Sequence, residues 1–111
     1  MGARVRLHIC GNTRFALSAF GLLNAEIIDL DFPAPLDEAR QKVGPNQVLL
    51  GNLNPVRALR NSTRKDILEG VARCHQQAGP RFIVGVGCEI PRDTPHENVL
   101  ALYEYASSHA A

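Results

Sequence analysis

The stretch FIVGVGCEIPRDTPHENV (residues 82–99) begins with a run of apolar residues and ends with the signature of a helix start. Its first half is not a strict alternation of apolar and polar side chains, which is typical of a strand whose two faces are both covered. In the second half, Thr94, Pro95 and Glu97 fit the N-cap, the first helical position and the capping-box position of a helix. The stretch therefore predicts a buried strand followed by a helix.

The same strand–helix pattern occurs four times along the chain. The predicted strands cover residues 5–10, 25–31, 47–53 and 82–90, and the predicted helices cover residues 13–23, 36–43, 63–78 and 95–108, with a longer loop through Asn54 and Pro55. Helical crossovers between consecutive strands require these strands to pair in parallel. The sequence therefore predicts an α/β fold of four parallel βα units, which is half of a TIM (βα)8 barrel.

The chain is short for a barrel. A complete (βα)8 barrel needs about 250 residues, whereas this chain has 111. Four parallel strands alone would expose two sheet edges, which favours aggregation unless something covers them. We therefore expect a fragment, one half of a split protein, or a half-barrel that pairs with itself or with a second chain. The start at Met1, close to the first strand, favours truncation.

The composition excludes several functional classes. Hydrophobic residues make up 45% and charged residues 21% of the chain, as in an ordinary globular domain. The net charge is +1 and the Lys and Arg residues are scattered, so no nucleic-acid surface is expected. Neither a membrane span nor a signal-peptide pattern is visible, so a cytoplasmic protein is expected. Three cysteines without a regular framework fit a reducing compartment.

Two cysteines and a histidine fall at the predicted strand ends. His8 and Cys10 are two residues apart on the first strand, so their side chains point to the same side. Cys88 lies near the end of the fourth strand, and the carboxyl ends of parallel barrel strands form one functional face. One imidazole and two thiolates suit zinc and leave a fourth position for a substrate. A core histidine with two buried thiols, or a Cys10–Cys88 disulfide, are the alternatives.

Other polar residues lie at the same predicted rim. Asp29 and Asp31 share one face of the second strand, and Asp31 is nearer its carboxyl end. Asn12 and Asn52 follow or end strands and are candidates for binding a substrate or cofactor, although asparagine more commonly forms turns. Cys74 lies on the apolar face of the third helix, where core packing is expected.

Three motifs occur in order along the chain, namely HICGNT (8–13), GNLNP (51–55) with Leu59 after it, and VGVGCEIPRDTPHENV (84–99). Together they resemble the methylcobamide:coenzyme M methyltransferase branch of the uroporphyrinogen decarboxylase superfamily. The resemblance extends through all four βα units, and it implies that residues 1–111 are the C-terminal half of such a barrel domain.

The resemblance also implies a chemistry. In that branch a His-x-Cys pair and a distant cysteine hold a catalytic zinc, and the matching residues here are His8, Cys10 and Cys88. The implied reaction moves a methyl group from a methyl-corrinoid, carried by a partner corrinoid protein, to a small thiol such as coenzyme M. A tetrahydrofolate-type acceptor remains an alternative. The isolated chain is expected to be inactive, because it lacks half of the barrel.

Two further comparisons refine these expectations. Cobalamin-independent methionine synthase is similar at a distance and has an acidic residue between its His-x-Cys and its last cysteine. This similarity makes Asp31 a candidate fourth zinc ligand or proton acceptor, with the capping of the following loop as the alternative. The decarboxylases usually carry Gly-His-Gly where this chain has Gly87, Cys88 and Glu89, and they use no metal. This difference weighs against decarboxylation, which is kept as the alternative function together with a non-catalytic half-barrel.

Overall fold

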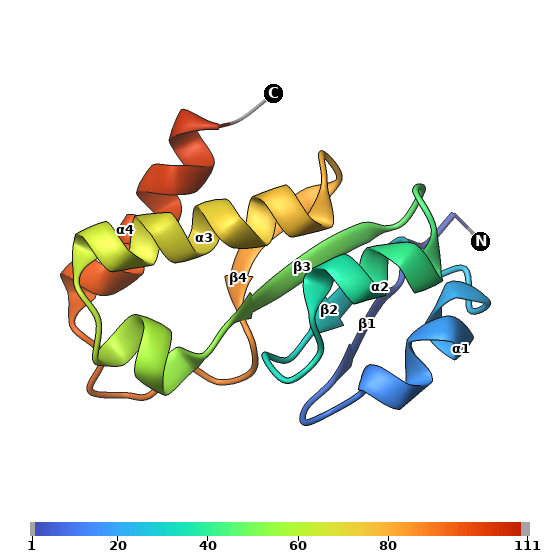
Figure 1. Ribbon diagram of the computed structural model, residues 1–111, viewed down its shortest axis with the longest axis horizontal. Coiled ribbons are helices and arrows are strands. Elements are labelled where there is room, and N and C mark those ends of the chain that lie inside the picture. The colour runs from blue at the N-terminus through green and yellow to red at the C-terminus, as the bar shows by residue number, and fades with distance from the viewer. Residues whose placement is uncertain (1, 110–111) are drawn as a thin grey trace.

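The computed structural model describes residues 2–109 and contains the four predicted βα units in chain order (Figure 1). The strands are β1 (Arg6–Ile9), β2 (Ile27–Leu30), β3 (Val48–Leu53) and β4 (Phe82–Val86). The helices are α1 (Leu17–Gly21), α2 (Leu36–Val43), α3 (Arg64–Ala78) and α4 (His96–Ser108), with a short 3-10 helix η1 (Arg14–Ala16) and a π-helix η2 (Pro55–Arg60). All neighbouring strands pair in parallel in the order β1-β2-β3-β4, which confirms the predicted fold class.

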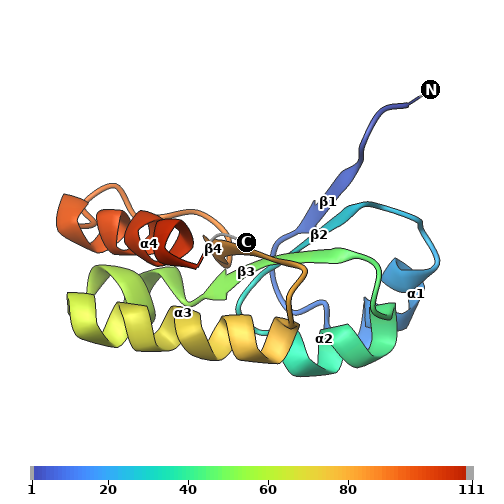
Figure 2. The same ribbon diagram turned by 90° about the horizontal axis from the view of Figure 1, so that it is seen from above.

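The hydrophobic core lies between the sheet and its helices. Figure 2 shows α2 and α3 running along one face of the sheet. Fully buried side chains from β2 and β3 meet fully buried side chains from the helices, and this set includes Ile28, Leu30, Leu49, Leu17, Leu36, Ile67 and Val71. Because side chains alternate along a strand, Asp29 points to the opposite face from Ile28 and Leu30. That opposite face, which would line the interior of a closed barrel, carries the polar residues of the candidate site.

The first predicted helix and the long loop differ from expectation. Residues 13–23 were predicted as one continuous helix, but they contain the 3-10 helix η1 followed by the five-residue helix α1. Residues 55–60, predicted as loop, form η2, because the side chain of Asn54 caps its start by accepting hydrogen bonds from Val56 N and Arg57 N, each at 3.0 Å. Sequence patterns based on apolar spacing alone do not report such caps.

The fourth βα unit also differs in detail. β4 ends at Val86 rather than at residue 90, because its neighbour β3 ends at Leu53 and the last ladder hydrogen bond runs from Gly87 N to Leu53 O at 2.8 Å. Cys88 therefore lies in a loop and not on a strand. The predicted Thr94 cap was wrong, since the Thr94 hydroxyl donates to Pro91 O at 2.7 Å and closes the preceding turn instead.

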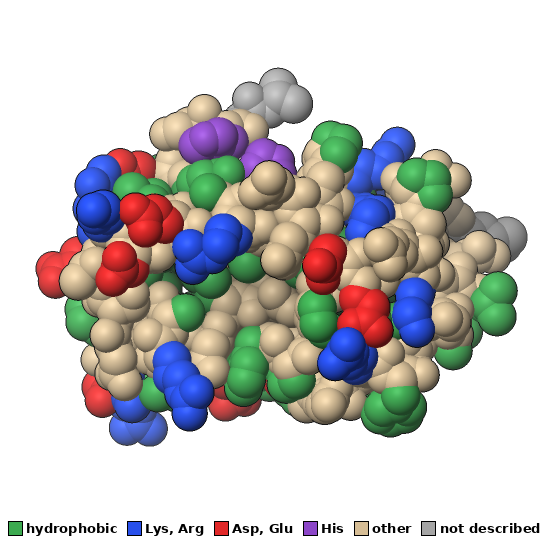
Figure 3. All heavy atoms as spheres, in the orientation of Figure 1, with side chains coloured by type: hydrophobic (Ala, Val, Ile, Leu, Met, Phe, Trp, Pro, Cys, Tyr) green, Lys and Arg blue, Asp and Glu red, His purple; other side chains and the backbone are tan. Residues whose placement is uncertain are grey.

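Acidic and basic side chains are interspersed over the helical face of the molecule (Figure 3). In the described part of the chain, no helix combines the length and the apolar character that crossing a membrane requires.

One buried amide joins α4 to the segment between η2 and α3. Asn98 is 4% exposed, and its Nδ2 donates to Leu59 O at 2.7 Å and to Ser62 O at 3.1 Å. Leu59 lies near the end of η2, and Ser62 lies in the turn that follows it. The side chain of Asn98 therefore supports the chain between the third and fourth βα units.

Replacing Asn98 with alanine should lower the free energy of unfolding by about 1–3 kcal/mol, because the buried carbonyls lose their donor. Urea denaturation followed by circular dichroism measures this change. The matched control is Asn61→Ala in the same segment, an exposed residue whose replacement should change stability by less than about 0.5 kcal/mol. Equal effects of the two substitutions would contradict the anchoring role of Asn98.

Candidate metal centre

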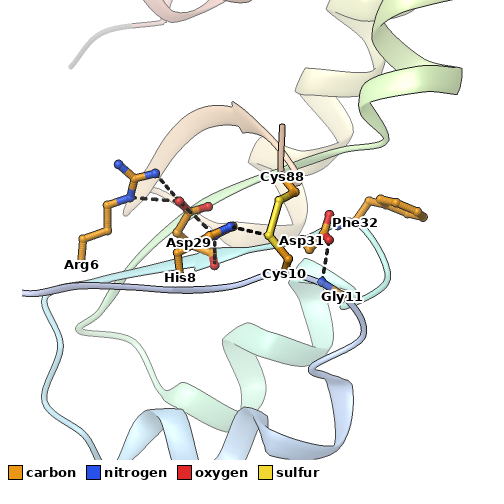
Figure 4. Close-up of a disulfide and its surroundings, with 8 residues drawn as sticks. All are labelled: Arg6, His8, Cys10, Gly11, Asp29, Asp31, Phe32 and Cys88. Atoms are coloured by element: carbon orange, nitrogen blue, oxygen red, sulfur yellow. Dashed lines mark hydrogen bonds and ion pairs between the residues drawn. A yellow bond between two sulfur atoms is a disulfide. The ribbon is translucent and has the colours of Figure 1, made fainter. Parts of the chain in front are cut away.

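Three potential metal ligands meet at the carboxyl ends of the strands (Figure 4). His8 comes from β1, Cys10 follows that strand directly, and Cys88 lies in the loop after β4. One donor atom from each of the three lies within 4.8 Å of the others, and among the described residues these three form the group that could share a metal ion. His8 Nε2 is 3.3 Å from Cys10 Sγ. Residues 78 positions apart in sequence are thus gathered at one point.

The two sulfurs of this group are joined to each other. Cys10 and Cys88 form a disulfide, and their Cα atoms are 5.9 Å apart. This Cα separation is within the ordinary range for disulfides, and it also permits two thiolates to converge on one ion. The same pair of cysteines can therefore be a disulfide when oxidised or a pair of free thiols when reduced.

Glycines beside both cysteines allow the two loops to approach. Gly11 has a φ of +93°, a conformation that L side chains rarely adopt, so the chain turns sharply just after Cys10. Gly87 precedes Cys88 and lies against the segment just after β2, where a Cβ atom would overlap Asp31 Oδ1 and lie 2.7 Å from Phe32 N. A larger residue at position 87 would require the Cys88 loop or the segment at Asp31 to shift.

Asp31 lies between the two cysteine loops. Its side chain is buried, its Oδ2 accepts a hydrogen bond from Gly11 N at 2.7 Å, and its Oδ1 accepts one from Phe32 N at 2.8 Å. These contacts match the loop-capping alternative. The roles of fourth ligand and proton acceptor stay predictions, and either role would compete with these two backbone donors.

The two asparagines at the rim bind backbone groups. Asn52 is buried, and its Nδ2 donates to Asp31 O at 3.1 Å and also to Ala34 O, which holds the loop between β2 and α2. Asn12 is exposed, and its Oδ1 accepts from Arg14 N at 3.1 Å in a local turn. Both amides thus perform the turn and loop functions typical of asparagine, and their cofactor-binding role stays a prediction.

The ion pair of Arg6 and Asp29 beside His8 was not predicted from the sequence. Arg6 Nε donates to Asp29 Oδ2 at 2.9 Å, Arg6 Nη2 pairs with the same oxygen, and His8 Nδ1 is 3.3 Å from it. The available signal was the spacing of Arg6 and His8, which places both on one face of β1. The partner strand was the missing information, because local spacing does not show that His8 is paired with Asp29.

A hollow of about 320 Å³ adjoins the group on the inner face of the sheet. Charged, polar and apolar residues line this hollow. They include Arg6, His8, Asp29, Leu50, Cys88 and Ile90. A small molecule in this hollow would therefore lie next to the potential ligands.

Cys74 behaves differently from the two rim cysteines. It is 8% exposed within the core cluster, which confirms the predicted packing role. Burial raises the pKa of the Cys74 thiol above its ordinary value, against smaller opposing effects from Asn52 and Arg73. The thiolate form, which is the nucleophile, is therefore scarce at neutral pH.

In the reduced, folded chain, iodoacetamide at neutral pH should modify Cys10 and Cys88 readily and leave Cys74 almost unmodified. Cys74 is protected because it is buried and its raised pKa keeps it in the thiol form. Mass spectrometry of peptides measures the three sites, and the urea-unfolded chain, in which all three should react, is the control. Modification of Cys74 as fast as Cys10 would refute the assigned difference.

The sequence of the chain matches a known protein family. The profile of uroporphyrinogen decarboxylase (URO-D) matches residues 2–109. The methylcobamide:CoM methyltransferase MtbA of Methanosarcina mazei is 34% identical over 93% of this chain and 30% of its own length. The uroporphyrinogen decarboxylase of Streptomyces avermitilis is 30% identical over 96% of this chain and 30% of its own length. The chain thus spans about a third of the length of these curated relatives.

A solved structure agrees on the fold. The structure of a methyltransferase from Methanosarcina mazei superimposes with a TM-score of 0.81, covers 99% of this chain and 32% of its own, and shares 23% sequence identity. At 23% identity this structural match shows the fold alone. The family is shown by the sequence profile, which matches residues 2–109. This chain therefore belongs to the uroporphyrinogen decarboxylase family.

Proposed function

We propose that this chain carries the zinc-binding rim of a barrel enzyme that transfers a methyl group from a methyl-corrinoid to a thiol such as coenzyme M. The observation that carries the proposal is the convergence of His8, Cys10 and Cys88 at the carboxyl ends of the strands. Because the chain spans 30% of its relatives, the activity is proposed for a complete barrel and not for this segment alone. The methylcobamide:CoM methyltransferases among the relatives support methyl transfer over decarboxylation.

The donor set fits zinc. Zinc prefers nitrogen and sulfur ligands in a tetrahedral arrangement, with bond lengths of about 2.0–2.3 Å. Ligand atoms around such an ion are separated by more than 3 Å, as are His8 Nε2 and Cys10 Sγ at 3.3 Å. The two sulfurs must be reduced and move apart to bind. Cys88 is free to move in this way because it lies in a loop beyond the last hydrogen bond of β4.

When bound, zinc lowers the pKa of an incoming thiol, so that the thiol reacts with the methyl donor as a thiolate. The residues of this chain supply the rest. His8 and Cys10 offer two donors from a single strand end, and Cys88 offers the third from across the sheet. The fourth position is proposed to face the adjoining hollow, where the thiol substrate would lie.

Asp31 is proposed to act mainly by holding the two cysteine loops. Its oxygens accept from Gly11 N and Phe32 N, and its Oδ1 lies against Gly87. A direct catalytic role would require it to release these backbone donors, which would cost the hydrogen bonds of a buried carboxylate. A corrinoid protein is proposed as the methyl carrier, supported by the relatives that are named as methylcobamide:CoM methyltransferases. Further strands are proposed to pair with the edge strands β1 and β4.

The reduced chain should retain about one zinc ion per molecule after gel filtration, as measured by inductively coupled plasma mass spectrometry. His8→Ala, Cys10→Ala and Cys88→Ala should each abolish retention, because two remaining donors hold zinc weakly. Cys74→Ala is the matched cysteine control and should retain the ion, since this thiol lies in the core. Oxidation with a low-molecular-weight disulfide should release the zinc, because a Cys10–Cys88 disulfide offers no thiolate. Retention of zinc by Cys10→Ala or Cys88→Ala would refute the site.

The thiol acceptor can be tested directly on the zinc-loaded chain. Adding coenzyme M should bring one more sulfur into the zinc coordination shell, detected by X-ray absorption at the zinc edge, because the open position accepts a thiolate. Ethanesulfonate, which lacks the thiol, is the control ligand and should leave the spectrum unchanged. Metal-independent binding of uroporphyrinogen, together with an unchanged spectrum on adding coenzyme M, would favour the decarboxylase alternative.

A further inference from the structure

A buried carboxylate lies directly beside the proposed histidine ligand. Asp29 on β2 is the register partner of His8 on β1, so the two side chains are neighbours on the same face of the sheet. The side chain of Asp29 is 4% exposed, compared with 30% for His8 and 60% for Arg6. Among these three groups, the acid is the one that is removed from water.

The contacts of His8 determine which ring nitrogen carries the proton. His8 Nδ1 lies 3.2 Å from Asp29 O and 3.3 Å from Asp29 Oδ2. A carbonyl oxygen only accepts hydrogen bonds, and so does an ionised carboxylate. Nδ1 must therefore be the protonated nitrogen, which leaves the lone pair of the neutral ring on Nε2. Nε2 is also the nitrogen that faces Cys10 Sγ, at 3.3 Å.

Arg6 gives the buried acid a charged hydrogen-bonding partner. Its Nε donates to Asp29 Oδ2 at 2.9 Å, and its Nη2 pairs with the same oxygen (Figure 4). A guanidinium is charged at every pH at which the protein folds, so it compensates a carboxylate that would otherwise be buried without a partner. Because Arg6 is two residues before His8 on β1, both side chains reach Asp29 from the same strand.

We propose that Asp29 is a positioning residue, anchored by Arg6, that holds His8 with Nδ1 protonated so that Nε2 presents its lone pair to the metal. The inference rests on the proposed zinc site, and it assigns to Asp29 and Arg6 the support of one ligand. Ligating histidines generally donate their second ring N–H to a carboxylate or carbonyl, which fixes the ring and strengthens it as a ligand. Here one residue supplies both acceptors.

The first test is made on the reduced, metal-free chain. Long-range proton–nitrogen correlation NMR distinguishes the two neutral tautomers, and the His8→Gln variant identifies the His8 signals among those of the four histidines. The wild-type chain should show the Nδ1–H tautomer. Asp29→Ala should shift His8 toward a mixture of tautomers, because only the backbone acceptor remains.

The second test measures zinc affinity by competition with a chromophoric chelator. Asp29→Ala should weaken zinc binding by roughly 10- to 100-fold, the usual effect of removing such a support. Asp29→Asn should weaken it less, since its side-chain oxygen still accepts from Nδ1. Arg6→Gln should also weaken binding, because the acid loses its partner. Asp37→Asn, an exposed acid on α2, is the matched control and should leave affinity unchanged.

The outcomes separate this inference from the proposed function. If the wild-type chain binds no zinc but its His8 tautomer depends on Asp29, the zinc proposal fails, and only the hydrogen bonding that fixes the His8 ring is upheld. If zinc binds but Asp29→Ala changes neither the tautomer nor the affinity by more than twofold, the positioning role is overturned. Should Asp29→Ala fail to fold by circular dichroism, Asp29→Asn and Arg6→Gln carry the same test.

Discussion

The curl of a small parallel sheet is the constraint on which the rest of this structure depends. β1 and β4 are the two edge strands of the order β1-β2-β3-β4, yet the segments that leave their carboxyl ends meet, with the Cα atoms of Cys10 and Cys88 5.9 Å apart. Parallel strands joined by helices must all end at one rim, and the twist of the sheet then turns its outer strands toward each other. A flat sheet of the same strands would keep these cysteines too far apart to share an ion or a bond.

Buried polar groups hold the rim in this shape. The carboxylate of Asp31 accepts from Gly11 N beside one cysteine, and the amide of Asn52 donates to Asp31 O from the neighbouring strand. The amide of Asn52 replaces water at a buried carbonyl, and the carboxylate of Asp31 does so at a part-buried amide, so removing either side chain leaves a backbone group without its partner. The same bonds that stabilise the loops therefore fix the positions of the potential ligands before any metal binds.

Membership of the uroporphyrinogen decarboxylase family does not by itself indicate which activity the protein has, because the relatives include proteins named as methyltransferases and as decarboxylases. The choice proposed here depends on the donors. Two thiols and an imidazole at one point are the donors that the proposed zinc chemistry needs, and the proposal depends on the cysteines being reduced. The proposed metal binding therefore requires the Cys10–Cys88 disulfide to be reduced, because a metal is bound by thiolates.

Local sequence determined the four βα units, their parallel pairing and the buried position of Cys74, because apolar periodicity and crossover connections are short-range signals. The candidate set of His8, Cys10 and Cys88 came instead from the rule that parallel strands end at one rim and from the resemblance carried by three separate motifs. Only the tertiary structure decided that Cys88 lies in a loop and that Asp29 lies beside His8. Those facts follow from where the neighbouring strand ends and from the register of β1 against β2. Both are set by contacts between segments about twenty or more residues apart, which no local pattern encodes.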